Sequence, residues 1–96
     1  MTKRQQLYIL LDAFLHEKYD EKTFCDAFED LFYPNVPKDE LSEFELLQFE
    51  ALGNVVTRFT PFEEDAENYP GIYRTKADVK KAANICSQNL EKERLL

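Results

Sequence analysis

The sequence predicts an all-α fold: a small antiparallel four-helix bundle with a short extra helical turn between the third and fourth helices. Apolar residues recur three and four positions apart in four separate segments, which is the spacing of one face of a helix. Each of these segments follows a residue that commonly caps a helix. The chain also has only two Gly and four Pro, too few for the many turns of an all-β protein.

The first two helices are expected over residues 3–17 and 21–32. Thr2 and Gln5 form a capping-box pattern before the first, and Asp20 is a candidate N-cap for the second. Their apolar stripes contain Leu7, Leu11, Phe14 and Leu15, widened by Ile9 and Leu10, and then Phe24, Phe28, Leu31 and Phe32. Pro34 and Pro37 prevent the second helix from continuing.

The third helix is expected over residues 43–58, since Ser42 and Glu45 form another capping-box pattern. At helical spacing a wide arc contains Phe44, Leu47, Ala51, Leu52, Val55, Val56 and Phe59. An arc this wide predicts a central helix that contacts more than one neighbour. The opposite face would carry Glu43, Leu46, Glu50, Gly53 and Thr57.

Two further elements complete the predicted bundle. Thr60 is a good N-cap and Pro61 a good first helical residue, so a short helical turn is expected over residues 62–66. The sequence Asn68-Tyr69-Pro70-Gly71 then predicts a turn. A last helix is expected over residues 76–91, with Thr75 and Asp78 resembling a capping box and with a stripe of Val79, Ala82, Ala83, Cys86 and Leu90.

A chain of 96 residues accommodates one domain, residues 1–96. Cys25 and Cys86 lie inside apolar-periodic segments, so we interpret them as buried reduced thiols. A disulfide between Cys25 and Cys86 is possible only if the helices bring the two residues within reach of one another. The first residues are too few and too polar for a signal peptide or a membrane span, which predicts a cytoplasmic protein.

Negative charge is concentrated in the middle of the chain. The formal net charge is −7, and residues 1–33, 34–70 and 71–96 carry −3, −7 and +3. An acidic surface repels nucleic acid and attracts basic protein surfaces. The charge pattern therefore favours a basic protein partner over DNA or RNA.

The sequence lacks the residue patterns of an enzyme, a cofactor site or a metal site. His16 is the single histidine and has no Ser or Cys partner at recognisable spacing. No Gly-rich loop could hold a phosphate. Glu63, Glu64, Asp65 and Glu67 do not have the alternating acids and central Gly of a calcium loop. We therefore expect no catalytic activity, no cofactor and no metal.

Several short motifs together resemble the colicin D-type immunity proteins, a bacterial self-protective family with members that accompany contact-dependent growth inhibition toxins. The resemblance is sharpest at Arg58-Phe59-Thr60-Pro61 and covers most of the chain. The other motifs are Phe14-Leu15, Tyr19-Asp20-Glu21-Lys22-Thr23-Phe24, Leu41-Ser42, Ala66-Glu67-Asn68-Tyr69 and a final helix that starts near Thr75.

The resemblance implies a small helical inhibitor of a nuclease toxin made by the same cell, similar to toxins that cleave tRNA. Carboxylates of such an inhibitor would stand where RNA presents phosphates. Relatives would carry them directly beside the Arg-Phe-x-Pro turn. Here Thr57, Thr60 and Phe62 occupy those positions, and the acids follow at residues 63–65.

The partner-binding residues predicted from the sequence are Glu43, Leu46, Glu50, Phe62, Glu63, Glu64, Asp65, Glu67 and Tyr69. The acids would pair with Lys or Arg of the toxin, and the exposed apolar side chains would anchor the complex. We expect a monomer that binds one toxin domain, at its active site or at an exosite. Two alternatives are a helical adaptor unrelated to toxins and a phage-encoded nucleic-acid mimic. A toxin gene directly upstream would distinguish the immunity protein from the adaptor, and the nucleic-acid mimic would bind several nucleic-acid enzymes rather than one.

Overall fold

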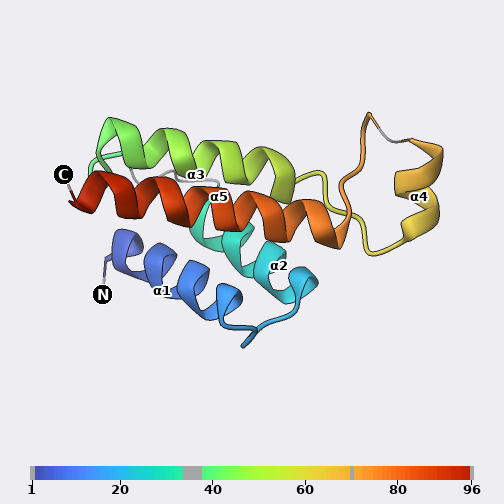
Figure 1. Ribbon diagram of the computed structural model, residues 1–96, viewed down its shortest axis with the longest axis horizontal. Helices are drawn as coiled ribbons and strands as arrows, with labels where there is room; N and C mark the ends of the chain where they lie inside the picture. The colour runs from blue at the N-terminus through green and yellow to red at the C-terminus, as the bar shows by residue number, and fades with distance from the viewer. Residues whose placement is uncertain (1, 34–37, 70, 96) are drawn as a thin grey trace.

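The computed structural model describes residues 2–33, 38–69 and 71–95. They form five helices: α1 (Lys3–Leu15), α2 (Glu21–Phe32), α3 (Glu43–Val56), α4 (Glu63–Asn68) and α5 (Lys76–Leu95) (Figure 1). Within those ranges the only strand-like pairing is one isolated parallel bridge between Phe59 and Arg74. The all-α prediction is confirmed. The bounds of α2 are those predicted, whereas α1 and α3 end two residues earlier and α5 continues four residues further than predicted.

The predicted capping residues start the four long helices. Thr2 and Ser42 form complete capping boxes with Gln5 and Glu45. Asp20 accepts a hydrogen bond from the Thr23 amide at 2.8 Å. The Thr75 amide donates to Asp78 at 3.0 Å, and the Asp78 amide donates back to the Thr75 hydroxyl at 3.3 Å. Each cap satisfies amides that the helix leaves unpaired and contributes about 1 kcal/mol.

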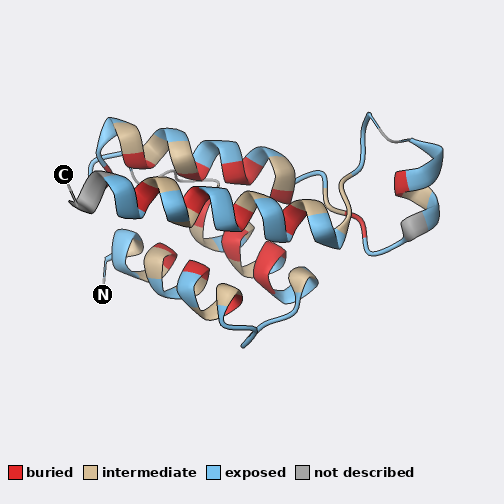
Figure 2. Cartoon of the chain, viewed as in Figure 1, coloured by how far each residue is buried: buried red, intermediate tan, exposed pale blue. Residues whose placement is uncertain are grey.

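Helices α1, α2, α3 and α5 pack together and are called the body below. Helix α3 packs along α5, α1 packs on α2 and α5, and α2 also contacts α3 (Figure 1). Their inner faces are buried (Figure 2). Phe28 lies near the middle of the core, with its ring 5.9 Å from Phe24, 5.2 Å from Phe32 and 6.4 Å from Phe49, within the range of favourable ring contacts.

The buried face of α3 differs from the predicted arc. Phe49, which the prediction left out, is completely buried, whereas Leu47 is 62 % exposed. Gly53, expected on the outer face, is buried, and a Cβ there would lie 2.5 Å from the Tyr33 hydroxyl. The same misassignment affects Ile9 of α1, which is 54 % exposed rather than part of the stripe. Because α3 carries apolar residues around most of its circumference, spacing alone does not fix which side faces the core.

A buried carboxylate joins the first turns of α1 and α3. Glu45 is only 6 % exposed, and its oxygens accept hydrogen bonds from the Ser42 amide, the Tyr8 hydroxyl and the Arg4 guanidinium. Arg4 Nη2 lies 2.9 Å from Glu45 Oε2. Burial acts to raise the pKa of Glu45, but these three donors outweigh it, and the pKa is lowered.

Both thiols lie in the core. Cys25 and Cys86 are each 3 % exposed and are not bonded to one another, which confirms the interpretation as buried reduced thiols. Burial, the main cause, raises the pKa of each to about 12. None of the helices in the described ranges has the length and apolar character needed to cross a bilayer.

Candidate protein-protein interface

The segment between α3 and α5, residues 57–75, projects from one end of the body and is called the arm below (Figure 1). It carries α4. As far as the structure describes the chain, α4 packs on no other helix. The arm lengthens the molecule to 40 Å, against 27 and 25 Å across. The arm therefore presents most of its surface to solvent, as Figure 2 shows.

Backbone and side-chain hydrogen bonds close the base of the arm. The Arg74 amide donates to the Arg58 carbonyl at 2.8 Å, and the Thr60 amide donates to the Arg74 carbonyl at 3.0 Å. The buried Thr60 hydroxyl accepts from the Phe62 amide at 3.2 Å and donates to Asp65 Oδ2 at 3.3 Å. Thr60 thus joins the crossing at the base to the first turn of α4.

The predicted start of the short helical turn is wrong. Helix α4 begins at Glu63, its N-cap is Phe62, and no side chain caps it. Thr60 and Pro61 lie before the helix, where the Thr60 amide donates to the Arg74 carbonyl. The predicted turn after α4 is present at Tyr69, whose carbonyl accepts from the Ile72 and Tyr73 amides at 3.0 and 3.1 Å. Pro70 of that turn lies outside the described residues.

Large apolar side chains of the arm are exposed. Phe62 is 67 % exposed, Tyr69 55 %, Ile72 58 % and Tyr73 38 %. The Tyr69 and Tyr73 rings meet edge to face, with centroids 6.2 Å apart. Clustered exposed apolar side chains of this size often mark sites where another molecule binds.

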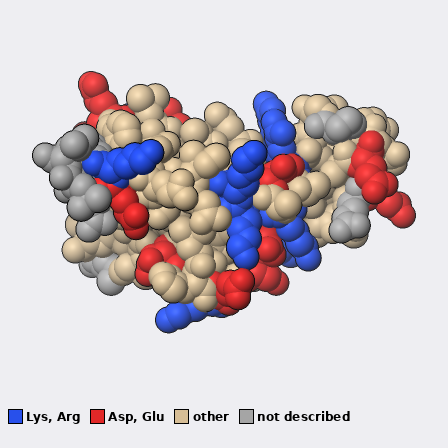
Figure 3. Space-filling view, viewed as in Figure 1, with Lys and Arg blue, Asp and Glu red and all other residues tan. Residues whose placement is uncertain are grey.

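Acidic side chains accompany these apolar groups. Glu64 and Glu67 of α4 are exposed, and Asp65 is half-buried against Thr60. Figure 3 shows Asp and Glu at the outer end of the arm and Lys and Arg over the start of α5, where Lys76, Lys80 and Lys81 are exposed. On this face Lys and Arg, with some Asp and Glu among them, lie between the outer end of the arm and the rest of the body (Figure 3).

The predicted site residues of α3 lie elsewhere. Glu43 is exposed at the end of α3 that is remote from the arm. Because the 14 residues of α3 span about 20 Å, Glu43 lies about that far from the base of the arm. Glu50 is exposed halfway along α3. It lies near the Tyr33 hydroxyl, since the pKa of Tyr33 is raised first by burial and then by the charge of Glu50. Leu46 was predicted to be exposed, but it is half-buried and packs on the core.

The structure therefore brings together only the part of the predicted site that belongs to the arm. Phe62, Glu64, Asp65, Glu67 and Tyr69 share one projecting element, whose α4 begins at Glu63. Ile72 and Tyr73 join this group and were missed. The sequence feature that could have indicated them is that two apolar residues directly follow the predicted turn and belong to no helical stripe. Local spacing assigns such residues to neither the core nor the surface.

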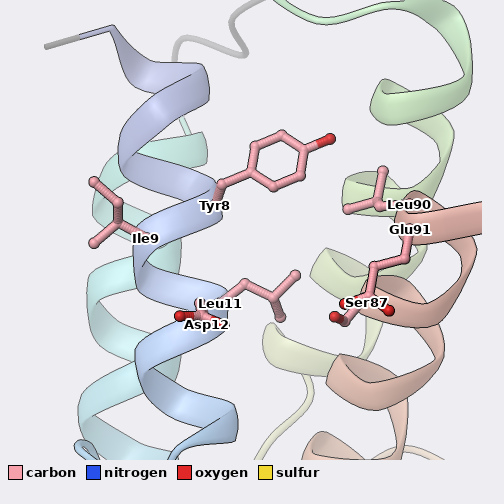
Figure 4. A pocket seen from close by; sticks show the side chains of 7 residues that line it. All are labelled: Tyr8, Ile9, Leu11, Asp12, Ser87, Leu90 and Glu91. Atoms are coloured by element: carbon pink, nitrogen blue, oxygen red, sulfur yellow. The ribbon is translucent and has the colours of Figure 1, made fainter. Parts of the chain in front are cut away.

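The surface has one hollow beside the arm and another on the body. A cleft of about 600 Å³ separates α4 from the start of α5 and is lined by Thr60, Pro61, Ala66, Glu67, Thr75, Lys76 and Ala77. A groove of about 250 Å³ runs between α1 and α5. Figure 4 shows Leu11 pointing across it toward α5 and Ile9 pointing away, while the Tyr8 hydroxyl points to α3, where it donates to Glu45.

In the cleft, the Thr60 hydroxyl donates to Asp65 and accepts from the Phe62 amide, so it is engaged within the arm. In the groove, Asp12 lies 3.5 Å from His16 Nδ1, and that histidine also contacts the Asp12 carbonyl at the exposed end of α1. Among the described residues no group of three His, Cys, Asp or Glu side chains is placed to hold a metal ion. With its exposed aromatic rings and carboxylates, the arm is the strongest candidate for a functional surface among the described residues.

No protein-family model, curated protein or solved structure matches this chain. What the chain does is therefore inferred from the arm and from the motifs of its sequence.

Proposed function

We propose that this chain is an immunity protein that binds and neutralises a cognate nuclease toxin. The toxin would be a bacteriocin or a contact-dependent growth inhibition toxin, with tRNA as the expected substrate. The inhibitor would be a cytoplasmic monomer, an antiparallel four-helix bundle with α4 as the extra element, and would bind one toxin domain. The observation that carries the proposal is the arm, which exposes carboxylates and aromatic rings away from the body.

The shape and charge of the arm suit a nuclease as partner. An enzyme that binds RNA needs Lys and Arg around a concave site, because it must neutralise phosphates. Glu64 and Glu67 are exposed on a narrow projection and could enter such a site. Carboxylates placed there would occupy the positions of phosphates and exclude the substrate.

The acids of the body have a different role in this proposal. Glu43 and Glu50 lie on α3 rather than on the arm. If the arm enters the toxin, these acids remain near the rim or outside the interface. Exposed charges at a rim change the association rate more than the strength of the bound complex.

Co-expression with the toxin domain encoded directly upstream tests the proposal. Cells that express both proteins are expected to grow, whereas cells that express the toxin domain alone are expected to die. Equal death in the two cultures would refute the immunity function.

A matched pair of charge reversals tests the role of the arm. Glu64→Lys with Glu67→Lys is expected to reduce the association rate at low salt by about 10-fold or more and to abolish protection. Glu43→Lys with Glu50→Lys changes the net charge equally and is expected to have the smaller effect. If the α3 pair has the larger effect, the interface lies on the body instead.

A further inference from the structure

Three apolar side chains follow α4 on the returning half of the arm, and they are called the anchor below: Tyr69, Ile72 and Tyr73. Two of them are more than half exposed, and all three lie outside the hydrophobic core. The Tyr69 carbonyl accepts hydrogen bonds from the Ile72 and Tyr73 amides, which holds the three residues in one turn. The two tyrosine rings are in edge-to-face contact. The anchor is thus one backbone turn that presents two rings in contact and the exposed side chain of Ile72.

The surroundings of the anchor define the chemistry of the surface that covers it. The anchor follows directly on α4, which carries Glu64 and Glu67 exposed. A matching surface needs an apolar pocket with Lys or Arg at its border, since like charges opposed across an interface cost several kcal/mol. A second copy that met this surface arm to arm would oppose acids to acids. A nucleic acid would oppose phosphates to them.

The arm is held in its projecting form before any partner binds. Thr60 and Arg74 close its base through the backbone, and the Thr60 hydroxyl holds the start of α4. Ordering a loop on binding weakens affinity, so a surface that is already ordered keeps more of its contact energy. Tyrosine adds large contact area with few rotatable bonds.

We infer that the anchor inserts into an apolar pocket of a protein partner, bordered by Lys or Arg that pair with the acids of α4. The identity of this partner as the toxin domain rests on the function proposed above. The two parts of the arm then act on different rates. The acids set the association rate and its salt dependence, and the anchor sets the dissociation rate.

Two double variants test this inference against the purified toxin domain. Tyr69→Ala with Ile72→Ala removes most of the anchor. Tyr19→Ala with Ile9→Ala removes a tyrosine and an isoleucine of similar exposure, 43 % and 54 %, from the body. We expect the anchor pair to dissociate about 100-fold faster, with an association rate within about 3-fold of wild type. The control pair is expected to keep both rates.

Four outcomes would overturn the inference. If the two double variants dissociate from the toxin domain at equal rates while wild type still binds and protects, the anchor is not part of the interface. The proposed immunity function would be unaffected by that result. A loss confined to the association rate would make the anchor a steering surface. Concentration-dependent dimers of wild type that the anchor variants lose would show that a second copy covers it. No binding of wild type to the toxin domain would refute both proposals together.

A single variant separates a loss of binding from a loss of folded structure. Ile72→Lys keeps a long side chain at an exposed position but places a charge where the pocket must be apolar. Its circular dichroism spectrum and melting temperature are expected to match those of wild type, while its dissociation is expected to be at least as fast as that of the anchor pair. Tight binding by a folded Ile72→Lys variant would exclude an apolar pocket.

Discussion

The body and the arm use aromatic residues in opposite ways. In the body, Phe24, Phe28, Phe32 and Phe49 are at most 1 % exposed and their rings contact one another. In the arm, Phe62 is 67 % exposed. Phenylalanine side chains are therefore buried away from water in the body, whereas that of Phe62 remains exposed to water.

This difference shows that the two regions are held by different interactions. Burial of large apolar side chains stabilises the body. Apart from Phe59, which packs on the core at the base, the arm buries little and depends on hydrogen bonds at its base and around Thr60. Its exposed rings contribute little to folding and are free to contribute to binding.

The largest expected effect comes from deleting one ring in each region. Phe28→Ala should lower the free energy of unfolding by about 3–5 kcal/mol, because it leaves a cavity among the other rings. Phe62→Ala should change it by less than about 0.5 kcal/mol, because the ring is already in water. Denaturant unfolding followed by circular dichroism measures both. Similar losses for the two variants would mean that the arm is packed against the body.

An intermediate effect is expected at Glu45. Glu45→Gln should lower the free energy of unfolding at pH 7 by about 1–3 kcal/mol, because it disturbs a buried, charge-assisted network. Glu50→Gln on the exposed face of the same helix is the matched control and should have little effect. If both variants lose the same free energy of unfolding, the hydrogen bonds of Glu45 contribute no more to stability than the exposed carboxylate of Glu50.

The Glu45 network also predicts a dependence on pH. The pKa of Glu45 is lower in the folded protein than its ordinary value of 4.5. Its contribution to stability is therefore fully present above the unfolded pKa and is lost as the pH falls through the folded pKa. Wild type should lose more stability than Glu45→Gln as the pH falls below about 4.5. Parallel pH profiles of unfolding would contradict this prediction.

The smallest expected effect on global stability is at the base of the arm. Thr60→Val keeps the shape of the side chain but removes the hydroxyl that contacts Phe62 and Asp65. Amides of α4 should exchange with solvent faster, while the free energy of global unfolding falls by about 1 kcal/mol or less. Thr57→Val, on an exposed side chain at the end of α3, should leave the exchange of α4 unchanged. Unchanged exchange in both variants would mean that the hydroxyl does not hold the arm.

Much of the body could be predicted from sequence because its signals are local. The caps at Thr2, Asp20, Ser42 and Thr75 depend on residues three positions apart, and all four are present. The buried side of α3 could not be fixed in the same way. Leu47 and Phe49 are both apolar, and only the neighbouring helices decide that Phe49 is buried.

The candidate site was harder to predict because its geometry depends on contacts between distant residues. The sequence indicated the acids and two of the exposed apolar residues. It did not indicate that Thr60 would pair with Arg74, and this pairing closes the arm. The predicted helix over residues 43–58 already implied that Glu43 lies about 20 Å from the arm. Shared negative charge, not position, therefore grouped residues that the fold separates.

The two buried cysteines give the protein an internal reporter of opening. A thiol reacts as its thiolate, and neither Cys25 nor Cys86 forms one near neutral pH while the core stays closed. An alkylating reagent can therefore label them only when the body opens, and motions confined to the arm leave them unlabelled. The labelling rate of the free protein and of a complex would then show whether binding of a partner to the arm slows the opening of the distant core.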